Sequence, residues 1–242
     1  VVEKANEAGA LVFSIDDSPA GGKVTATVRA DNVNAGAQGA EEMAKRLATA
    51  PCSKDDSCIV LELQGALTTP NGLDRSKGFA ETLAKLAPKV QIIQRPTEWT
   101  ADMAADAAQN VLTQNPNLAG IFMASELMAT AVNAQLSAAG KGAAVGEDGA
   151  VIRIAIDGTP QGLQLIRDKA LDATVSQPLS AYATKTAELI ELVHGGGKIE
   201  IGPRDDGQVI DTPVGPQYQL KATLVTAENV DSPDLWANQV GK

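Results

Sequence analysis

The sequence has few aromatic residues and little positive charge. Phenylalanine, tryptophan and tyrosine together make up 3% of the 242 residues, histidine occurs once, and the formal net charge is −10. No basic run and no stripe of interleaved aromatic residues interrupts this acidic composition. Because binding to a phosphate backbone requires clustered lysine and arginine, nucleic acid is not an expected partner.

Long hydrophobic runs are also missing. No apolar run has the length of a membrane span, and no secretory signal peptide begins at Val1. The first residues, VVEKANEAG, are typical of the second half of a helix. We therefore expect that a leader and further residues were removed, or that the chain is a fragment.

Cysteine occurs only twice, at Cys52 and Cys58, on either side of the polar loop SKDDS. Without a nearby histidine the pair does not form a zinc site, and the spacing is not that of a CxxC redox motif. A disulfide that closes this small loop is the favoured interpretation, and two free thiols are the alternative. A disulfide would place the protein in an oxidising compartment outside the cytoplasm.

Short apolar segments alternate with amphipathic segments along most of the chain. The segments expected to be strands are 10–15, 23–30, 58–65, 90–96, 118–125, 151–157 and 171–178. The segments expected to be helices are 31–48, 79–86, 100–116, 126–140, 160–167 and 180–197, and 208–213 and 218–226 are expected to be extended. This alternation predicts an α/β fold, with a parallel sheet covered by helices on both faces.

The stretch VIRIAIDGTPQGLQLIR, residues 151–167, shows how a site could be built on such a sheet. Its strand ends at Asp157, after which Gly158 permits a turn, Thr159 can cap a helix and Pro160 suits the first helical position. Ligands of open α/β sheets bind beyond the carboxyl ends of strands, so Asp157 would face a cleft. The alternative is that Asp157 only bonds local backbone N–H groups, as many turn aspartates do.

Polar or aromatic residues recur at or after other strand ends. The set is Asp16, Asn71, Trp99, Ser125, Asp157 and Gln177. Although loop residues are polar by default, this repetition favours a shared ligand-binding role.

Catalysis is not expected. Asp16 and Asp157 could form the carboxylate pair of a glycoside hydrolase, but no glycosidase pattern surrounds them. Ser125 lacks a GxSxG elbow and a histidine partner, and the single histidine, His194, is expected to cap a helix end. We therefore predict no catalytic residue, no metal and no cofactor.

Seven short motifs occur in a characteristic order. They are DNVNAG, LQG, DRSKGF, the Pro-x-Glu-Trp loop, SELMA, IDGTP and ATVSQP. In this combination the chain, from Val1 to about Val230, resembles the sugar-binding periplasmic proteins of ABC importers, the ribose-binding-protein group of type I. The resemblance implies two doubly wound parallel-sheet lobes, joined by three crossings, with a sugar held between them.

The resemblance also implies where the lobes divide. Residues 1–30 and 179–213 would form the remainder of the N-terminal lobe, and residues 31–177 and 217–242 the C-terminal lobe. Hinges would lie near 30–31, 177–178 and 213–217. Family members begin with additional strands and helices of the first lobe, so we expect that lobe to be incomplete here. The missing N-terminal segment would then stay bound to a nicked protein, or belong to a longer chain.

Sugar-binding positions of the family fall on Asp16, Trp99, Ser125, Asp157 and Gln177. Carboxylates can accept hydroxyl hydrogen bonds worth about 1.5 to 3 kcal/mol each, and an indole offers an apolar face to the C–H side of a sugar. Serine and glutamine side chains add further donors and acceptors.

Two arginines that often bind the sugar in this family are replaced here, by Asp17 and Leu73. Asn71 and Arg29 lie close enough in sequence to compensate. With so many acids, the cleft is expected to favour a polyol, a deoxy sugar or a ligand that bears an amine.

The function that these expectations favour is an extracytoplasmic solute-binding protein. It would close on a sugar or polyol and deliver it to the membrane subunits of an ABC permease, as a monomer that binds no nucleic acid. It would be periplasmic or extracellular, and an N-terminus outside this sequence could carry a lipid anchor. The alternative is the effector-binding core of a sugar-responsive repressor, with a glycoside hydrolase less favoured.

Overall fold

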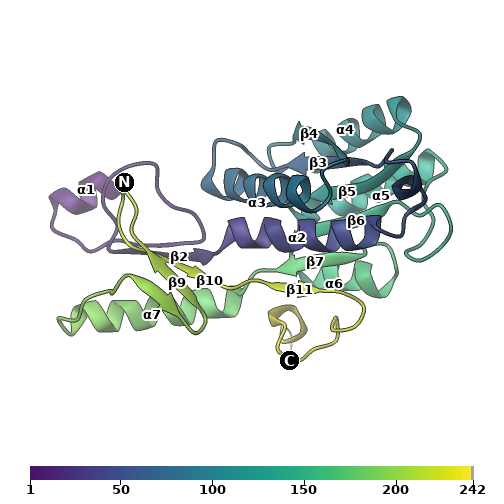
Figure 1. The fold of residues 1–242 in the computed structure, drawn as a ribbon. Helices are drawn as coiled ribbons and strands as arrows, with labels where there is room; N and C mark the ends of the chain where they lie inside the picture. Colours follow the sequence, from purple (N-terminus) through teal and green to yellow (C-terminus); the bar gives the residue numbers. More distant parts are fainter. Residues whose placement is uncertain (241–242) are drawn as a thin grey trace. The chain divides into compact units, whose positions relative to one another are not determined.

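The computed structural model describes residues 1–240, which form two compact units (Figure 1). Unit 1 comprises Val1–Asp31 and Pro178–Ala222, and unit 2 comprises Asn32–Gln177 and the segment from Thr223 onward. The chain therefore crosses between units three times. No helix within residues 1–240 is both long and apolar enough to cross a membrane.

Unit 2 is built on a six-stranded sheet with the order β11-β7-β6-β5-β3-β4. Strands β3 (Ile59–Gln64), β4 (Gln91–Pro96), β5 (Leu118–Met123), β6 (Ile152–Asp157) and β7 (Ala173–Ser176) are parallel, and β11 (Thr223–Val225) is antiparallel to β7. The carboxyl ends of the parallel strands consequently lie along one edge of the sheet.

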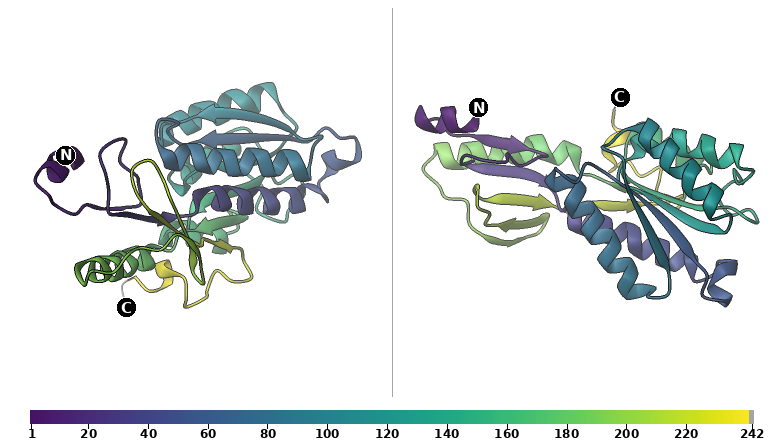
Figure 2. Two further views of the ribbon diagram at one scale, coloured as in Figure 1. Left: turned by 60° about the vertical axis from the view of Figure 1, so that its left-hand side comes forward. Right: turned by 90° about the horizontal axis from the view of Figure 1, so that it is seen from above.

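Helices cover both faces of this sheet. Helices α2 (Asn32–Leu47) and α3 (Pro70–Leu86) pack on one face, and α4 (Ala101–Gln114), α5 (Ala129–Ala138) and α6 (Pro160–Arg167) on the other (Figure 2). Strand residues alternate accordingly: Ile121 and Met123 join the core beneath α4 and α5, whereas Phe122 stacks on Phe79 of α3. The predicted doubly wound α/β fold is confirmed.

Unit 1 has a five-stranded sheet with the order β1-β2-β10-β9-β8. Strands β1 (Phe13–Ile15), β2 (Ala26–Ala30) and β10 (Gln217–Leu220) are parallel, and β9 (Gly207–Ile210) and β8 (Gly202–Arg204) continue as antiparallel strands. Helix α7 (Leu179–His194) packs on β2, and its Tyr182 hydroxyl accepts a hydrogen bond from the N–H of Ala30, the last residue of β2, at 2.8 Å. The short helix α1 (Val2–Glu7) precedes the sheet.

Two sequence expectations differ from the structure. The helix expected over 79–86 begins at Pro70, because Thr69 caps it by accepting the Gly72 N–H at 3.2 Å. The extended segment 218–226 is two strands: β10 pairs with β2 in unit 1, and β11 pairs with β7 in unit 2. Residues 217–222 thus lie in unit 1 rather than in the second lobe, and the third crossing falls between Ala222 and Thr223.

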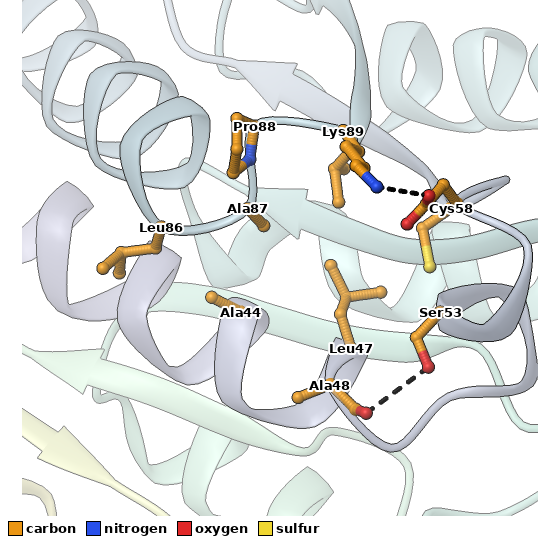
Figure 3. Close-up of a pocket in the computed structure, with 11 residues that line it drawn as sticks. Ala44, Leu47, Ala48, Ser53, Cys58, Leu86, Ala87, Pro88 and Lys89 are labelled. Carbon is orange, nitrogen blue, oxygen red and sulfur yellow. Dashed lines mark hydrogen bonds and ion pairs between the residues drawn. The ribbon is translucent and has the colours of Figure 1, made fainter.

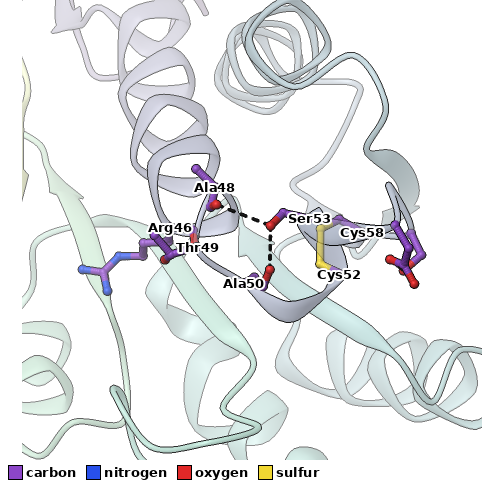
Figure 4. The surroundings of a disulfide bond; sticks show 9 residues. Arg46, Ala48, Thr49, Ala50, Cys52, Ser53 and Cys58 are labelled. Atoms are coloured by element: carbon purple, nitrogen blue, oxygen red, sulfur yellow. Dashed lines mark hydrogen bonds between the residues drawn. A yellow bond between two sulfur atoms is a disulfide. The ribbon is translucent and has the colours of Figure 1, made fainter.

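Cys52 and Cys58 form a disulfide, as the favoured interpretation predicted (Figure 4). The bond closes the loop between the 3₁₀ turn η1 (Pro51–Lys54) and β3. Inside the loop the Ser57 N–H donates to the Cys52 carbonyl at 3.0 Å, and the Ser53 hydroxyl donates to the Ala50 carbonyl at 2.8 Å. The loop is therefore fixed at the amino end of β3, away from the strand ends that carry the predicted site.

The packing of α2 against α3 depends on two glycines. A Cβ atom on Gly36 would lie 2.2 Å from the Arg75 carbonyl oxygen, and one on Gly78 would lie 1.9 Å from the Val33 carbonyl oxygen. The two helix backbones are thus in direct contact, which positions the α3 residues that face the strand ends.

Gly36→Ala is expected to lower the free energy of unfolding by about 1 to 3 kcal/mol, because the new methyl group forces α2 and α3 apart. Glu41→Ala, at an exposed position of the same helix, is the matched control and should cost much less. Urea unfolding of both variants checks this. Equal midpoints would show that the helices do not touch at Gly36.

Candidate functional site

Three of the predicted residues meet at the carboxyl ends of adjacent strands. Asp157, the last residue of β6, accepts hydrogen bonds from Gln177 Nε2 to Oδ1 at 2.8 Å and from Ser125 Oγ to Oδ2 at 2.6 Å. Ser125 follows β5 and Gln177 follows β7, and both strands flank β6 in the sheet. The parallel arrangement therefore explains why residues 52 positions apart in sequence share one carboxylate.

Arg75 completes this group from helix α3. Its Nη1 donates to Asp157 Oδ1 at 3.1 Å and to the Ala124 carbonyl at 2.7 Å, and its Nε donates to Asn32 Oδ1 at 2.7 Å. The residue is only 3% exposed. A guanidinium held by three acceptors is rigid, so it fixes the orientation of the Asp157 carboxylate.

The sequence-based interpretation placed the expected arginine of this helix at Leu73 and did not predict a role for Arg75. Leu73 is 52% exposed, while Asn71, Arg75 and Phe79 are all buried. These three residues are spaced by four and therefore share one helix face. The signal that identifies Arg75 is therefore this spacing of four, which becomes visible only when the helix is taken to begin at Pro70.

Asn71 joins the group indirectly. Its Oδ1 accepts a hydrogen bond from Asn32 Nδ2 at 3.0 Å, and Asn32 in turn accepts from Arg75. Asn32 is the first residue of α2 and is 1% exposed. The polar network thus connects α2 and α3 to the ends of β5, β6 and β7. We call Asn32, Asn71, Arg75, Ser125, Asp157 and Gln177 the Asp157 cluster.

Trp99 lies next to the Asp157 cluster. The Arg75 Cζ atom is 5.5 Å from the centroid of its indole ring, a distance typical of a cation–π contact. On Gly65 a Cβ atom would lie 2.1 Å from the ring, so the indole touches the backbone there. Trp99 is half-buried in the loop after β4.

The backbone at these positions is unusual. Asp157 has a φ of 142°, Trp99 a φ of 64° and Glu98 a φ of 48°. Non-glycine residues rarely adopt positive φ, and such strain persists where the surrounding structure holds it, often at functional sites. Asp157 and Trp99 belong to the predicted site and Glu98 flanks it, while Asp56 and Lys169 also have positive φ but lie outside it.

Glu126 holds the loop that follows Asp157. Its Oε1 accepts the Gly158 N–H at 2.9 Å and the Thr174 hydroxyl, and its Oε2 accepts the Thr159 N–H at 2.8 Å and the Thr159 hydroxyl. Burial raises the pKa of the Glu126 carboxyl, while the hydrogen bonds from Thr159 and Thr174 act in the opposite direction. Glu126 is therefore a positioning residue that the sequence did not single out.

Asp16 belongs to the other unit. It follows β1 with a φ of 70°, and its N–H donates to the Val28 carbonyl at 2.8 Å. Arg29, considered as a compensating donor, lies on β2 in the same unit. A shared role of Asp16 with the Asp157 cluster stays a prediction.

A hollow of about 400 Å³ lies elsewhere in unit 2, at the amino ends of β3 and β4 (Figure 3). The end of α2, the disulfide loop and the turn after α3 form its mostly apolar walls, with Leu47, Cys58 and Leu86 among them. It contains no residue of the predicted site. Within residues 1–240 no group of three or more histidine, cysteine, aspartate or glutamate side chains could hold a metal ion.

Glu126→Gln is expected to lower the free energy of unfolding by about 1 to 3 kcal/mol. Each carboxylate oxygen accepts a backbone N–H, and glutamine can offer an oxygen to only one of them, so its amide group faces the other donor. The control Glu81→Gln changes an exposed residue of α3 and should leave stability nearly unchanged. Chemical denaturation measures both, and a neutral effect of Glu126→Gln would contradict the assigned role.

Comparisons with known proteins agree with this fold. A family model described as the periplasmic binding protein domain matches residues 1–198. The D-allose-binding periplasmic protein of Escherichia coli K12 is 27% identical over 235 residues, which cover 94% of this chain and 68% of the relative. The ribose import binding protein of the same organism is 28% identical over 200 residues, covering 82% of this chain and 62% of that protein.

Solved structures show the same fold. A galactofuranose binding protein superposes with a TM-score of 0.77 at 21% identity, covering 98% of this chain and 74% of the other. An arabinose binding protein from Geobacillus stearothermophilus has a TM-score of 0.71 at 25% identity, with coverages of 95% and 72%. This chain thus spans 62% to 74% of the length of these four proteins. The family model, which spans most of the chain, and the shared two-unit architecture confirm the resemblance seen in the motifs: this chain belongs to the periplasmic binding protein domain family.

Proposed function

We propose that this chain is part of an extracytoplasmic solute-binding protein that binds a neutral sugar or polyol and delivers it to an ABC permease. The observation that carries the proposal is the Asp157 cluster, where donors and acceptors from three strand ends and two helices surround the carboxylate of a residue whose backbone φ is positive. Trp99 beside it supplies an aromatic ring. A polar group next to an aromatic ring suits a molecule with hydroxyls and an apolar C–H face.

The charges in the cluster favour an uncharged ligand. The carboxylate of Asp157 is paired with the guanidinium of Arg75 at 3.1 Å, so these two groups together carry no net charge. A ligand amine would have to compete with Arg75 for the same oxygen. We therefore favour neutral sugars and polyols over the amine-bearing ligand that the acidic sequence also suggested.

The names of the relatives support the same class of ligand. Allose, ribose and galactofuranose are neutral sugars, and a neighbouring structure contains bound myo-inositol, a neutral polyol. Ligand binding would draw on Asn71, Trp99, Ser125, Asp157 and Gln177 in unit 2 and on Asp16 in unit 1. The three crossings after Asp31, Gln177 and Ala222 would serve as hinges.

The mechanism proposed is binding without chemistry. A ligand with higher affinity for a closed arrangement of the two units shifts the population toward it, and a permease recognises that arrangement. The disulfide favours an oxidising compartment, periplasmic or extracellular, over the cytosolic setting of a repressor core. No catalytic step is assigned to any residue.

A panel of neutral pentoses, hexoses and polyols is expected to contain a compound that raises the melting temperature of the protein, because ligand binding stabilises the native state. Asp157→Asn should weaken the tightest of these compounds at least about tenfold, through loss of a charged acceptor. Asp148→Asn, at an exposed position, is the control. The sugar-binding proposal fails if no member of the panel shifts the melting temperature.

Closure predicts a smaller radius of gyration in the presence of the tightest compound. Small-angle scattering of the protein with and without saturating ligand measures this change. The matched control is the same compound added to Asp157→Asn at a concentration too low to bind that variant. Identical profiles of the wild type in both conditions would rule out closure as the signal to a permease.

A further inference from the structure

One tyrosine side chain connects two of the three crossings between the units. Strand β2 ends at Ala30 and helix α2 begins at Asn32, so Asp31 alone lies between them at the first crossing. The second crossing follows Gln177, and α7 begins two residues later. Tyr182, in the first turn of α7, reaches back from there to the end of β2.

The hydrogen bond that makes this connection replaces a missing strand partner. The N–H of Asp31 donates to β10 at 2.8 Å, so the N–H of Ala30, its neighbour in the chain, points the other way, toward β1. The last pair between β1 and β2 is Ile15 with Val28, two residues short of Ala30. The Tyr182 hydroxyl accepts this N–H instead, at 2.8 Å.

Both partners of this hydrogen bond are shielded from water. Ala30 is 0% exposed and Tyr182 is 4% exposed. Because a buried N–H without an acceptor is unfavourable, loss of the hydroxyl would drive the end of β2 to open and bond water. Since Asp31 is the only residue between Ala30 and α2, this opening would loosen the first crossing itself.

We propose that the Tyr182 hydroxyl is a positioning group, which holds the first crossing in the conformation needed for ligand binding and does not contact the ligand. The inference rests on the proposed function, because it requires two units that close on a ligand. Only molecules with an intact β2 end would bind, so loss of the hydroxyl lowers the affinity for every ligand by the same factor. A residue that contacts the ligand would instead affect some compounds more than others.

The test compares Tyr182→Phe with Tyr218→Phe, which each remove one of the two tyrosine hydroxyls of the sequence. Tyr218 lies in the sheet of the same unit and is 5% exposed, but its hydroxyl donates to Asp206 in the turn between β8 and β9. It is therefore the matched control. Titration calorimetry measures the dissociation constants of the tightest panel sugar and of its monodeoxy analogues, at a temperature where the wild type and both variants are folded.

Tyr182→Phe is expected to bind every compound about two- to tenfold more weakly than the wild type, the range for one neutral hydrogen bond. Tyr218→Phe should lower the melting temperature but bind every compound as the wild type does. Unchanged affinities of Tyr182→Phe would overturn the inference, because the hydroxyl would then serve stability alone. A loss that differs between analogues would also overturn it, because it would indicate direct contact with the ligand.

Hydrogen exchange of the wild type, followed by NMR, tests the same contact without a substitution. The Ala30 amide is expected to be protected in the free protein, although β1 ends before it. Saturating ligand should slow its exchange further, because the bound form requires an intact end of β2. If Tyr182→Phe does not fold, an Ala30 amide that exchanges as fast as an unstructured one, or equally fast with and without ligand, overturns the inference.

Failure of the proposed function would look different. If the wild type binds no sugar in the panel, the proposed function has failed, and the role assigned to Tyr182 falls with it. That result appears in the wild-type titrations before any variant is compared.

Discussion

The ion pair between Arg75 and Asp157 is the interaction on which the organisation of unit 2 at its carboxyl edge depends. It joins a helix to the end of a central strand, and the other polar contacts attach to one partner or the other. Asn32 and Ala124 hold the arginine, while Ser125 and Gln177 hold the aspartate. Removing such a pair from water costs free energy, and the hydrogen bonds that the pair makes with Asn32, Ala124, Ser125 and Gln177 offset part of that cost.

Much of this arrangement could be predicted from the sequence. Parallel strands separated by helices bring their carboxyl ends to one edge, so Ser125, Asp157 and Gln177 could be expected to meet without any coordinates. Thr159 and Pro160 also mark the start of α6 correctly. These predictions rest on patterns among residues a few positions apart, namely apolar strand segments and helix caps, and a single sequence is sufficient to recognise them.

The remaining features depend on contacts between segments far apart in the chain. The predicted start of α3 is too late because PNGLD contains the weak helix formers proline, asparagine and glycine. In the structure Thr69 caps the helix and Pro70 occupies its first turn, and together they allow the helix to begin there. The split of residues 217–225 between two sheets depends on distant pairing partners: β10 pairs with β2, 190 positions earlier, and β11 pairs with β7, 47 to 51 positions earlier. Glu126 could not be assigned because three of its four donors come from the loop after β6 and the fourth from Thr174 in β7, both far from Glu126 in the sequence.

The contact between Trp99 and Gly65 has a consequence for how such a site could diversify. The indole rests against a position that has no side chain, and even a methyl group there would overlap the ring. A larger residue at position 65 would displace the indole and so alter the depth available beside Arg75. In the proposed site, a substitution of Gly65 would therefore change the size of ligand that fits beside Trp99, although residue 65 contributes no side-chain hydrogen bond.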